Sequence, residues 1–357
     1  MSDRTTATQE GFACAINSMQ QRFAIERNTA TMQERNNCVR HLARLAHSSS
    51  DTRETRSRLR IACAATALTI ALSGCSQASI ADTAAASAVS SIPSTLAASP
   101  TSPAQTLRLQ SVNNFRDLAG PGGGYSTADG RRVREGVLYR SNALASSDAD
   151  AATLDALGVS AVYDLRTTEE IGKNPDRVPS GARYTQVDII GDATSAAVTS
   201  SVDLSTPQGA ATLLTEANRQ FVTDPSMRAQ FSTLLTAIAT TNGPQIFHCT
   251  GGKDRAGWVS AVLLKIAGVD DETVMSNYLL SNEYLKDSID TTTAEVRTTK
   301  GERAAEAMRV LMGVSPEFLQ AGFDEIRVHF GTFDNYVTTG LRLSTDTVDA
   351  LRIKLTV

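Results

Sequence analysis

The stretch HCTGGKDRAG, residues 248–257, follows the short run Gln245–Phe247 and precedes a helix-like segment that ends near Ala267. In that segment, apolar residues recur at helical spacing and mark a buried face: Val259, Val262, Leu263 and Ile266. A strand, a glycine-containing loop and an amphipathic helix in this order are typical of α/β folds, which bind ligands at the carboxyl ends of their strands. We therefore expect a ligand site at residues 248–257.

The segments around this loop predict the same class of fold. Strands are expected at Val159–Leu165, Tyr184–Ile190 and Gln245–Cys249, a hairpin at Arg131–Arg140, and helices at Ser147–Leu157, Met227–Thr240, Glu302–Met312, Pro316–Phe330 and Thr345–Leu355. Because strands alternate with helices, we expect an α/β fold with a mainly parallel sheet flanked by helices and a helical C-terminal third.

Charge and composition divide the 357 residues into three segments. Residues 1–74 hold ten Arg, no Lys and six acidic residues, and residues 75–105 are rich in Ala, Ser, Thr and Pro, with Asp82 as their one charge. Residues 106–357 carry eighteen Arg and six Lys against thirty-one acidic residues. This acidic balance argues against broad nucleic-acid binding, which relies on a basic surface. We interpret residues 106–357 as one catalytic domain behind a flexible tether at 75–105.

Residues 1–74 are interpreted as a leader that contains an export signal. Three arginines, at positions 56, 58 and 60, precede an apolar run at 61–74, which is shorter than the ~20 residues that span a bilayer. The sequence LSGC at 72–75 resembles the bacterial lipobox, which implies cleavage before Cys75 and lipidation of its sulfur. The alternative is an ordinary signal peptide with an incidental cysteine. Residues 1–55 are interpreted as the product of a start codon assigned too far upstream.

Lipidation of Cys75 implies an exported protein anchored to a membrane of the bacterial envelope or at the cell surface. Ser76, in place of Asp after the cysteine, implies the periplasmic face of the outer membrane in a Gram-negative cell. Cleavage before Cys75 also leaves Cys249 as the one free thiol of the mature chain, in a compartment that favours disulfides. A thiol without a partner is what a catalytic thiolate requires.

The loop has the parts needed to hold a phosphate against a thiolate. Backbone amides of residues 250–256 can turn inward as a nest, and the paired glycines permit the required backbone angles. Arg255 can grip two phosphate oxygens, and the N-terminus of the following helix adds positive charge. Cys249 is then a nucleophile that forms a phosphocysteine, which water hydrolyses.

The Cys-x5-Arg spacing alone is a weak signal, because Cys38 and Arg44 in the leader show it as well. That copy lacks the glycines, the preceding strand and the following helix. All three accompany Cys249, and this combination is specific.

HCTGGKDRAG resembles the signature HC-x-x-GKDR-x-G of the atypical bacterial group of cysteine-dependent tyrosine phosphatases. NFRDLAG at 114–120, LYRS at 138–141 and DLRT at 164–167 resemble three further motifs of this group. The resemblance covers most of residues 110–285 and only loosely the C-terminal third. It implies a tyrosine-phosphatase-like sheet of four or five strands flanked by helices, no metal and no cofactor. The implied substrates are phosphoproteins, with phosphotyrosine first and phosphoserine or phosphothreonine in addition, or phosphoinositides.

The same resemblance assigns roles within the loop. It makes Cys249 the nucleophile and Arg255 the cation that grips the phosphate. The remaining phosphate-binding positions are Thr250, Gly251, Gly252, Lys253, Ala256 and Gly257. Ala256 departs from the family, which has Thr or Ser there, with a hydroxyl that helps the thiolate leave. The departure concerns the speed of turnover more than the type of reaction.

Two aspartates are candidates for the general acid that protonates the leaving oxygen. Asp254 lies in the loop beside Arg255, and Asp164 ends a predicted strand and so lies at the same edge of the sheet. Each has a structural alternative: a salt bridge for Asp254 and a loop-holding hydrogen bond for Asp164. Position and family resemblance favour Asp254.

Neighbouring side chains have structural interpretations beside the functional ones. His248 is either a buried group that orients the loop or a functional group, and Lys253 is either a solvated rim charge or a second cation for multiply phosphorylated substrates. Arg116 and Asp117 are expected to pair and to pin the N-terminal segment under the loop, and the alternative is a direct role in catalysis. Trp258 is expected in the core.

Two other classes of function remain open beside the phosphatase that we predict. One is a sulfur- or arsenate-transfer enzyme on a similar loop, which typically needs a shorter loop or resolving cysteines. The other is a non-catalytic module that binds phosphorylated ligands, for which Ala256 is the one supporting feature. We make no prediction of the oligomeric state.

Overall fold

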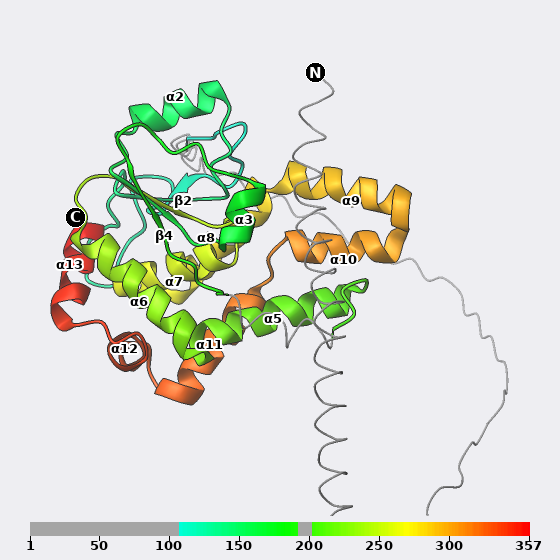
Figure 1. Ribbon diagram of the computed structural model, residues 1–357. Helices are drawn as coiled ribbons and strands as arrows, with labels where there is room; N and C mark the ends of the chain where they lie inside the picture. Colours follow the sequence, from blue (N-terminus) through cyan, green and yellow to red (C-terminus); the bar gives the residue numbers. More distant parts are fainter. Residues whose placement is uncertain (1–106, 192–201) are drawn as a thin grey trace, which may run out of the picture. The chain divides into compact units, whose positions relative to one another are not determined.

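The computed structural model describes residues 107–191 and 202–357 of the chain (Figure 1). The predicted export signal, the lipidation site Cys75 and the tether at 75–105 lie outside the described residues and stay predictions. Each helix of the described part is too short or too polar to cross a lipid bilayer.

Five strands form one sheet in the order β1-β2-β5-β3-β4. They are β1 (Arg116–Asp117), β2 (Leu138–Ser141), β3 (Ala161–Asp164), β4 (Arg183–Gln186) and β5 (Gln245–His248). β5 pairs in parallel with β2 and β3, and β3 pairs in parallel with β4, whereas β1 is antiparallel to β2. All residues of the central strand β5 are buried, as expected for a strand covered on both faces. The predicted α/β fold with a mainly parallel sheet is confirmed.

Alternate residues of the central strands face two different cores. Phe247 of β5 and Tyr163 of β3 belong to the larger core, whereas Ile246 and Val162 belong to a smaller core on the opposite face. Cys249, two residues after Phe247, also belongs to the larger core. The period of the strand therefore decides on which side of the sheet the thiol lies.

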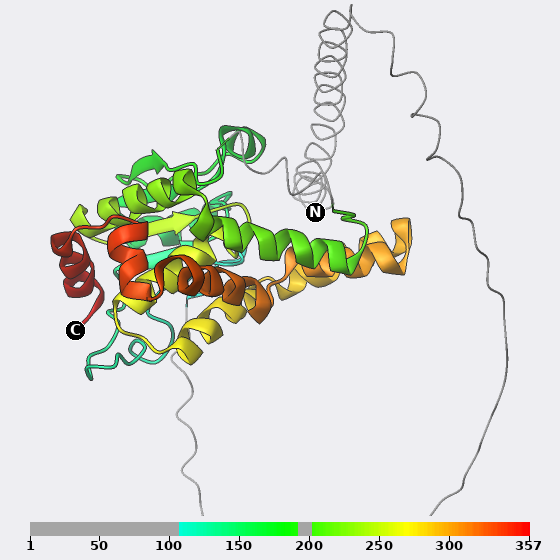
Figure 2. The same ribbon diagram turned by 90° about the horizontal axis from the view of Figure 1, so that it is seen from below.

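Helices cover both faces of the sheet and form the C-terminal third. Their bounds are α2 (Asp148–Ala156), α3 (Thr168–Lys173), α5 (Pro207–Thr223), α6 (Pro225–Thr240), α7 (Arg255–Ile266), α8 (Asp271–Tyr284), α9 (Lys286–Lys300), α10 (Glu302–Met312), α11 (Pro316–Phe330), α12 (Phe333–Asn335), the π-helical turn η1 (Tyr336–Gly340) and α13 (Thr345–Leu355). Figure 1 shows α2 on one side of the sheet and α6 and α7 on the other. In Figure 2, α11 runs beside α5, and α9 lies beside α10. The predicted helical C-terminal third is confirmed.

Trp258 joins the C-terminal helices to the helix that follows the loop. It is fully buried in α7 and packs against the rings of Phe221, Phe323 and Tyr336, from α5, α11 and η1. Gly322 of α11 allows this packing, since a Cβ there would lie 2.5 Å from the indole ring. The prediction that Trp258 belongs to the core is confirmed.

The hairpin predicted at Arg131–Arg140 is wrong. Arg132 and Val133 make only single bridges, with Ser126 and Thr356, and the chain enters the sheet at Leu138. β2 then pairs with β5 in parallel and with the two-residue strand β1. Alternating residues identify extended chain, but they do not identify its partner strand.

Five helices, α3, α5, α8, α9 and the short α12, are missing from the sequence-based prediction. α5 has a recognisable start, because Thr206 accepts a hydrogen bond from the amide of Gly209 and Pro207 occupies the first turn. α9 has no such signal. Its sequence, KDSIDTTTAEVRTTK, is rich in threonine, which favours helices weakly.

Candidate active site

The loop at residues 249–254 connects the carboxyl end of the central strand β5 to the N-terminus of α7. Cys249 is a free thiol with 2% of its surface exposed. Asp254 precedes the first residue of α7 and makes no side-chain cap, so the first amides of the helix remain open to another acceptor.

Three consecutive carbonyl groups of the loop are bound from outside it. The donors are the amide of Ala143 for Thr250 (3.2 Å), Asn114 Nδ2 for Gly251 (2.9 Å) and Arg140 Nη2 for Gly252 (2.7 Å). In a trans peptide the N–H points opposite to the C=O of the same plane. The amides of residues 251–253 are therefore turned away from these donors, towards the interior of the loop.

These amides are also unpaired. Within residues 107–191 and 202–357, the N–H groups of residues 250–256 donate to no acceptor. A run of unpaired amides at the positive end of a helix suits a tetrahedral oxyanion. The loop can therefore hold a phosphate group above the Cys249 thiol.

Two glycines of the segment 248–257 are required by their surroundings. Gly252 has a φ of +68°, and a Cβ there would lie 2.4 Å from the carbonyl oxygen of Ser141. Gly257, in the first turn of α7, lies so close to Tyr278 of α8 that a Cβ would come within 2.9 Å of the ring. Gly251 is different, because a Cβ there would meet only the Lys253 side chain, at 3.7 Å.

Arg255 is held in place by Glu170 of α3. Its Nη1 and Nη2 donate to the two carboxylate oxygens at 2.8 and 2.7 Å, and Nη1 also donates to the carbonyl of Leu165 at 3.0 Å. Thr250 Oγ1 donates to the same carboxylate at 2.5 Å. Burial opposes the charge of Glu170, but the Arg255 cation and these hydrogen bonds outweigh it and lower its pKa to about 2. Likewise, Glu170 outweighs the effect of burial on Arg255 and raises the pKa of its guanidinium.

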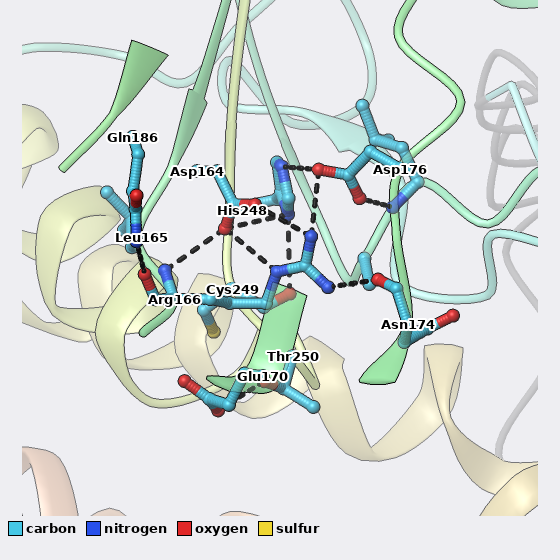
Figure 3. Close-up of polar contacts among 12 residues, drawn as sticks. Asp164, Leu165, Arg166, Glu170, Asn174, Asp176, Gln186, His248, Cys249 and Thr250 are labelled. Atoms are coloured by element: carbon cyan, nitrogen blue, oxygen red, sulfur yellow. Dashed lines mark hydrogen bonds and ion pairs between the residues drawn. The ribbon is translucent and has the colours of Figure 1, made fainter. Parts of the chain in front are cut away.

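A buried polar network lies beneath the start of the loop (Figure 3). Asp164 accepts hydrogen bonds from Arg166 Nε (2.8 Å) and Nη2 (2.7 Å) and from the hydroxyl of Tyr184 (2.7 Å). His248 is fully buried, with Nε2 3.1 Å from an oxygen of Asp176 and Nδ1 3.5 Å from the Cys249 carbonyl. Figure 3 shows the Cys249 sulfur on the side of Glu170 and not on that of Asp176. The network supports the loop from behind.

The same network contains the one group of potential metal ligands among the described residues: Asp164, Asp176 and His248. Arg166 Nη2 lies 2.7 Å from Asp164 and 2.9 Å from Asp176, so a guanidinium already supplies the positive charge between these carboxylates. Burial opposes the charge of Asp164, but Arg166 outweighs it and lowers the pKa of this carboxyl.

Comparison with known proteins places this chain in a family. Residues 107–357, which include the whole described part of the chain, match the model of the family described as "Tyrosine phosphatase family". The chain belongs to the tyrosine phosphatase family.

The names of individual relatives agree with this family assignment. A protein of Cupriavidus necator that is named as a tyrosine-protein phosphatase is 31% identical over 251 residues, 69% of this chain and 88% of the relative. The triple specificity protein phosphatase PtpB of Mycobacterium tuberculosis is 30% identical over 274 residues, 67% of this chain and 95% of the relative. Among solved structures, TpbA of P. aeruginosa is 18% identical, with a TM-score of 0.27 over 51% of this chain and 89% of that one. The fold of this phosphatase is assigned from the order and directions of the strands given above.

The two candidate acids of the phosphatase have different surroundings. The Asp254 side chain is 26% exposed at the loop, and its oxygens lie 3.0 and 2.9 Å from Lys253 Nζ. The Asp164 side chain is fully buried, and both of its oxygens accept hydrogen bonds. Lys253 is itself 7% exposed, so it is not the solvated rim charge of the first interpretation.

The predicted pair of Arg116 and Asp117 is wrong. The two side chains leave β1 in opposite directions: Arg116 donates to Ser281 of α8, whereas Asp117 accepts from the amides of Ala119 (2.9 Å) and Gly136 (2.6 Å). Consecutive residues of a strand point to opposite faces, and this excludes the pair. Arg116 does hold the N-terminal segment, through Asn114, whose amide binds the loop at Gly251.

Several residues that shape the site are missing from the sequence-based prediction: Asn114, Arg140, Arg166, Glu170 and Asp176. Three of them lie inside motifs that resemble the family, NFRDLAG, LYRS and DLRT, so the signal was present in the sequence. Glu170 carries a signal of another kind. It forms a capping box with Thr167 at the start of α3, directly after β3 and its short loop.

Proposed function

We propose that this phosphatase hydrolyses phosphotyrosine through a phosphocysteine at Cys249. The observation that carries the proposal is the position of the free thiol, at the floor of a loop whose amides are unpaired and whose cation, Arg255, is fixed by Glu170. The thiolate attacks phosphorus while the bond to the tyrosyl oxygen breaks. Water then attacks the phosphocysteine, the P–S bond breaks, and phosphate and the thiolate are released.

Asp254 is the general acid in this scheme. It gives its proton to the leaving tyrosyl oxygen and takes one back from the attacking water. Its position at the rim of the loop and its partial exposure suit this role, whereas Asp164 lies below the loop with both oxygens engaged. A phosphate in the loop also offers Lys253 another anionic partner, which leaves the carboxylate of Asp254 free to carry a proton.

The substrate range extends beyond phosphotyrosine in this proposal. Lys253, buried beside the loop, is a second cation that suits phosphoinositide headgroups with more than one phosphate. The relative PtpB is named a triple specificity phosphatase, which supports activity on phosphoserine and phosphothreonine as well.

The test of the mechanism is Cys249→Ser in the full chain. A serine hydroxyl is un-ionised where a thiol would be a thiolate, so turnover of phosphotyrosine peptides and para-nitrophenyl phosphate is expected to vanish while tungstate still binds. Acid quenching of the wild-type protein with ³²P-labelled substrate should trap a phosphocysteine that the serine variant lacks. Turnover that survives in Cys249→Ser contradicts the mechanism. A wild-type protein that releases no phosphate also contradicts it, and would fit a sulfur-transfer enzyme or a module that only binds phosphorylated ligands.

We also propose that Cys75 carries a lipid that anchors the phosphatase in the bacterial envelope. The sequence LSGC at 72–75 after an apolar run, and the uncharged tether that follows, support this. Wild-type protein expressed in a bacterium should enter the membrane fraction and incorporate labelled palmitate, and Cys75→Ala should lose the label. Recovery of wild-type protein in the cytosol with residues 1–74 intact would refute the anchor.

A further inference from the structure

Two buried arginines behind the loop have no carboxylate partner in the part of the chain that the structure describes. Arg116 is 2% exposed and Arg140 is fully buried, yet no Asp or Glu of that part lies within 4.0 Å of either guanidinium. The other buried arginines of this part are paired, Arg166 with Asp164 and Asp176, and Arg255 with Glu170. Arg116 and Arg140 therefore differ from their neighbours in charge balance.

The contacts of these two arginines are with neutral groups. Arg140 donates to Asn277 Oδ1 (3.1 Å) and to the loop carbonyl of Gly252 (2.7 Å). Arg116 donates to the backbone carbonyl of the same Asn277 (3.1 Å) and to Ser281 Oγ (3.1 Å), as well as to Asn114, and lies over the ring of Tyr284. The Nε of each arginine has no partner among the described residues. Two positively charged side chains thus donate hydrogen bonds to the same residue, Asn277.

Such an arrangement is costly for the fold, because a buried charge is destabilising unless an opposite charge accompanies it. Burial lowers the pKa of Arg140 to about 10. Burial and the neighbouring Arg140 lower the pKa of Arg116. Both guanidinium groups still carry a proton at neutral pH. No carboxylate of the described residues supplies their counter-charge by direct contact.

The geometry shows where that charge would sit. Arg140 of β2 lies opposite Phe247 of β5, and Phe247 precedes Cys249 by two residues. The side chains of Arg140, Phe247 and Cys249 therefore lie on the same face of the sheet. Its hydrogen bond to Gly252 turns the next amide, that of Lys253, into the loop. Against the effect of burial, the charge that most raises the pKa of Arg140 is that of a Cys249 thiolate.

We propose that Arg140, supported by Arg116, is the buried counter-charge of the anion held in the loop. This rests on the proposed function, since the anion is the phosphate dianion of the substrate. Arg140 is a positioning residue: it does not touch the phosphate, but it orients the Gly252 peptide and places a positive charge behind it. The fold tolerates two unpaired charges, and binding of the dianion relieves that cost.

The sharpest test is Asn277→Asp, because it supplies a carboxylate to Arg140, beside the backbone carbonyl that binds Arg116, without removing either arginine. The side chain keeps its shape, and the atom that now accepts from Arg140 becomes charged. In the full chain, the melting temperature without ligand is expected to rise. The affinity for tungstate, measured by calorimetry, is expected to fall roughly tenfold or more, as for loss of one favourable charge interaction. A purely structural role for the arginines predicts unchanged affinity.

The matched control is Asn282→Asp on the same helix. Its amide binds the backbone of Val314 at both atoms, and it makes no contact with Arg116 or Arg140 among the described hydrogen bonds. This variant adds the same charge to α8 and is expected to leave the tungstate affinity within about threefold of wild type. Equal losses in both variants, or wild-type affinity in Asn277→Asp, would overturn the proposal.

A second pair of variants separates charge from hydrogen bonding. Arg140→Lys keeps the charge and a donor for Gly252, whereas Arg140→Gln keeps only a donor. We expect Lys to bind tungstate within a few-fold of wild type and Gln to lose roughly tenfold or more. Arg228→Gln is the control, because Arg228 also donates to backbone carbonyls, of Val222, Thr223 and Gly340, and has no ion pair among the described residues. Lys and Gln variants of equal affinity would refute the role of charge.

The outcomes keep this proposal distinct from the proposed function. If Arg140→Gln does not fold, Asn277→Asp decides the matter, since it retains both arginines. If the wild-type protein binds tungstate but does not hydrolyse para-nitrophenyl phosphate, the proposed function fails while the charge balance is still tested. A wild-type protein that binds no tungstate overturns the counter-charge proposal itself.

Discussion

Glu170 holds both terminal nitrogens of Arg255, at 2.7 and 2.8 Å, across eighty-five positions of sequence. The carboxylate comes from the first turn of α3, and the guanidinium comes from the first residue of α7. Each residue thereby restricts the other to one orientation. Nη1 also donates to the carbonyl of Leu165 and Nη2 to Thr250 Oγ1, so among the described contacts only Nε of Arg255 is left for a ligand in the loop.

We expect Glu170→Gln to lower kcat/KM on phosphotyrosine peptides by roughly 10- to 100-fold, because a charged double hydrogen bond no longer fixes Arg255. Steady-state kinetics should show the loss in kcat as well as in KM. Glu169→Gln is the control, since Glu169 on the same helix pairs with Lys173 at the surface. Comparable losses in the two variants would remove the special role of Glu170.

The same pair makes stability depend on pH. The pKa of Glu170 is lowered from 4.5 to about 2, so its contribution is fully present above pH 4.5 and is lost as the pH falls towards 2. Urea unfolding of wild type and Glu170→Gln should therefore differ at pH 7 by at most about 3 kcal/mol, and this difference should shrink below pH 4.5. A difference that stays constant down to pH 3 would contradict the assignment.

The general acid is tested by dependence on the leaving group. Asp254→Asn should lose much more activity on phosphotyrosine, a poor leaving group, than on an activated aryl phosphate, since general acids contribute typically ~10²–10⁴-fold. It should also flatten the basic limb of the pH–rate profile. Asp164→Asn is expected to reduce stability instead, because it breaks the buried pair with Arg166. If Asp164→Asn shows the leaving-group pattern and Asp254→Asn does not, Asp164 is the acid.

Gly252→Ala and Gly251→Ala form a matched pair. At Gly252 an alanine would need a positive φ and would clash with the carbonyl of Ser141, so we expect lost activity and a free energy of unfolding lower by at least about 1–2 kcal/mol. Gly251 has ordinary space for a Cβ, so its variant should fold with a stability near that of wild type. Thermal unfolding and phosphatase assays compare the two. Equal tolerance of both substitutions would show that the backbone of the loop differs from the one described.

The sequence predicts the local parts of this site well. The strand, loop and helix around Cys249 follow from apolar spacing and glycines within one short segment, and helices α10, α11 and α13 have the predicted bounds. The partners of the loop could not be predicted in the same way. Arg140 and Glu170 reach it from segments far away in the chain, and their roles depend on the order of strands in the sheet. The hairpin at 131–140 is wrong because β2 pairs with the distant strand β5 and not with a local one. The Arg116–Asp117 pair is wrong because consecutive residues of a strand point to opposite faces.

The three carbonyls of the loop that are bound from outside have a consequence for evolution and for protein design. Their donors belong to other segments, so the shape of the anion cradle does not depend on the side chains at positions 253 and 254. Lys253 is buried beside the loop and Asp254 is partly exposed, and each side chain can be exchanged while the backbone of the cradle keeps its form. Recognition of the alcohol part of a phosphate ester is thus separable from recognition of phosphate. A library restricted to Lys253, with the proposed acid Asp254 retained, should change which esters are accepted, while inorganic phosphate, held by the loop amides, still inhibits its members.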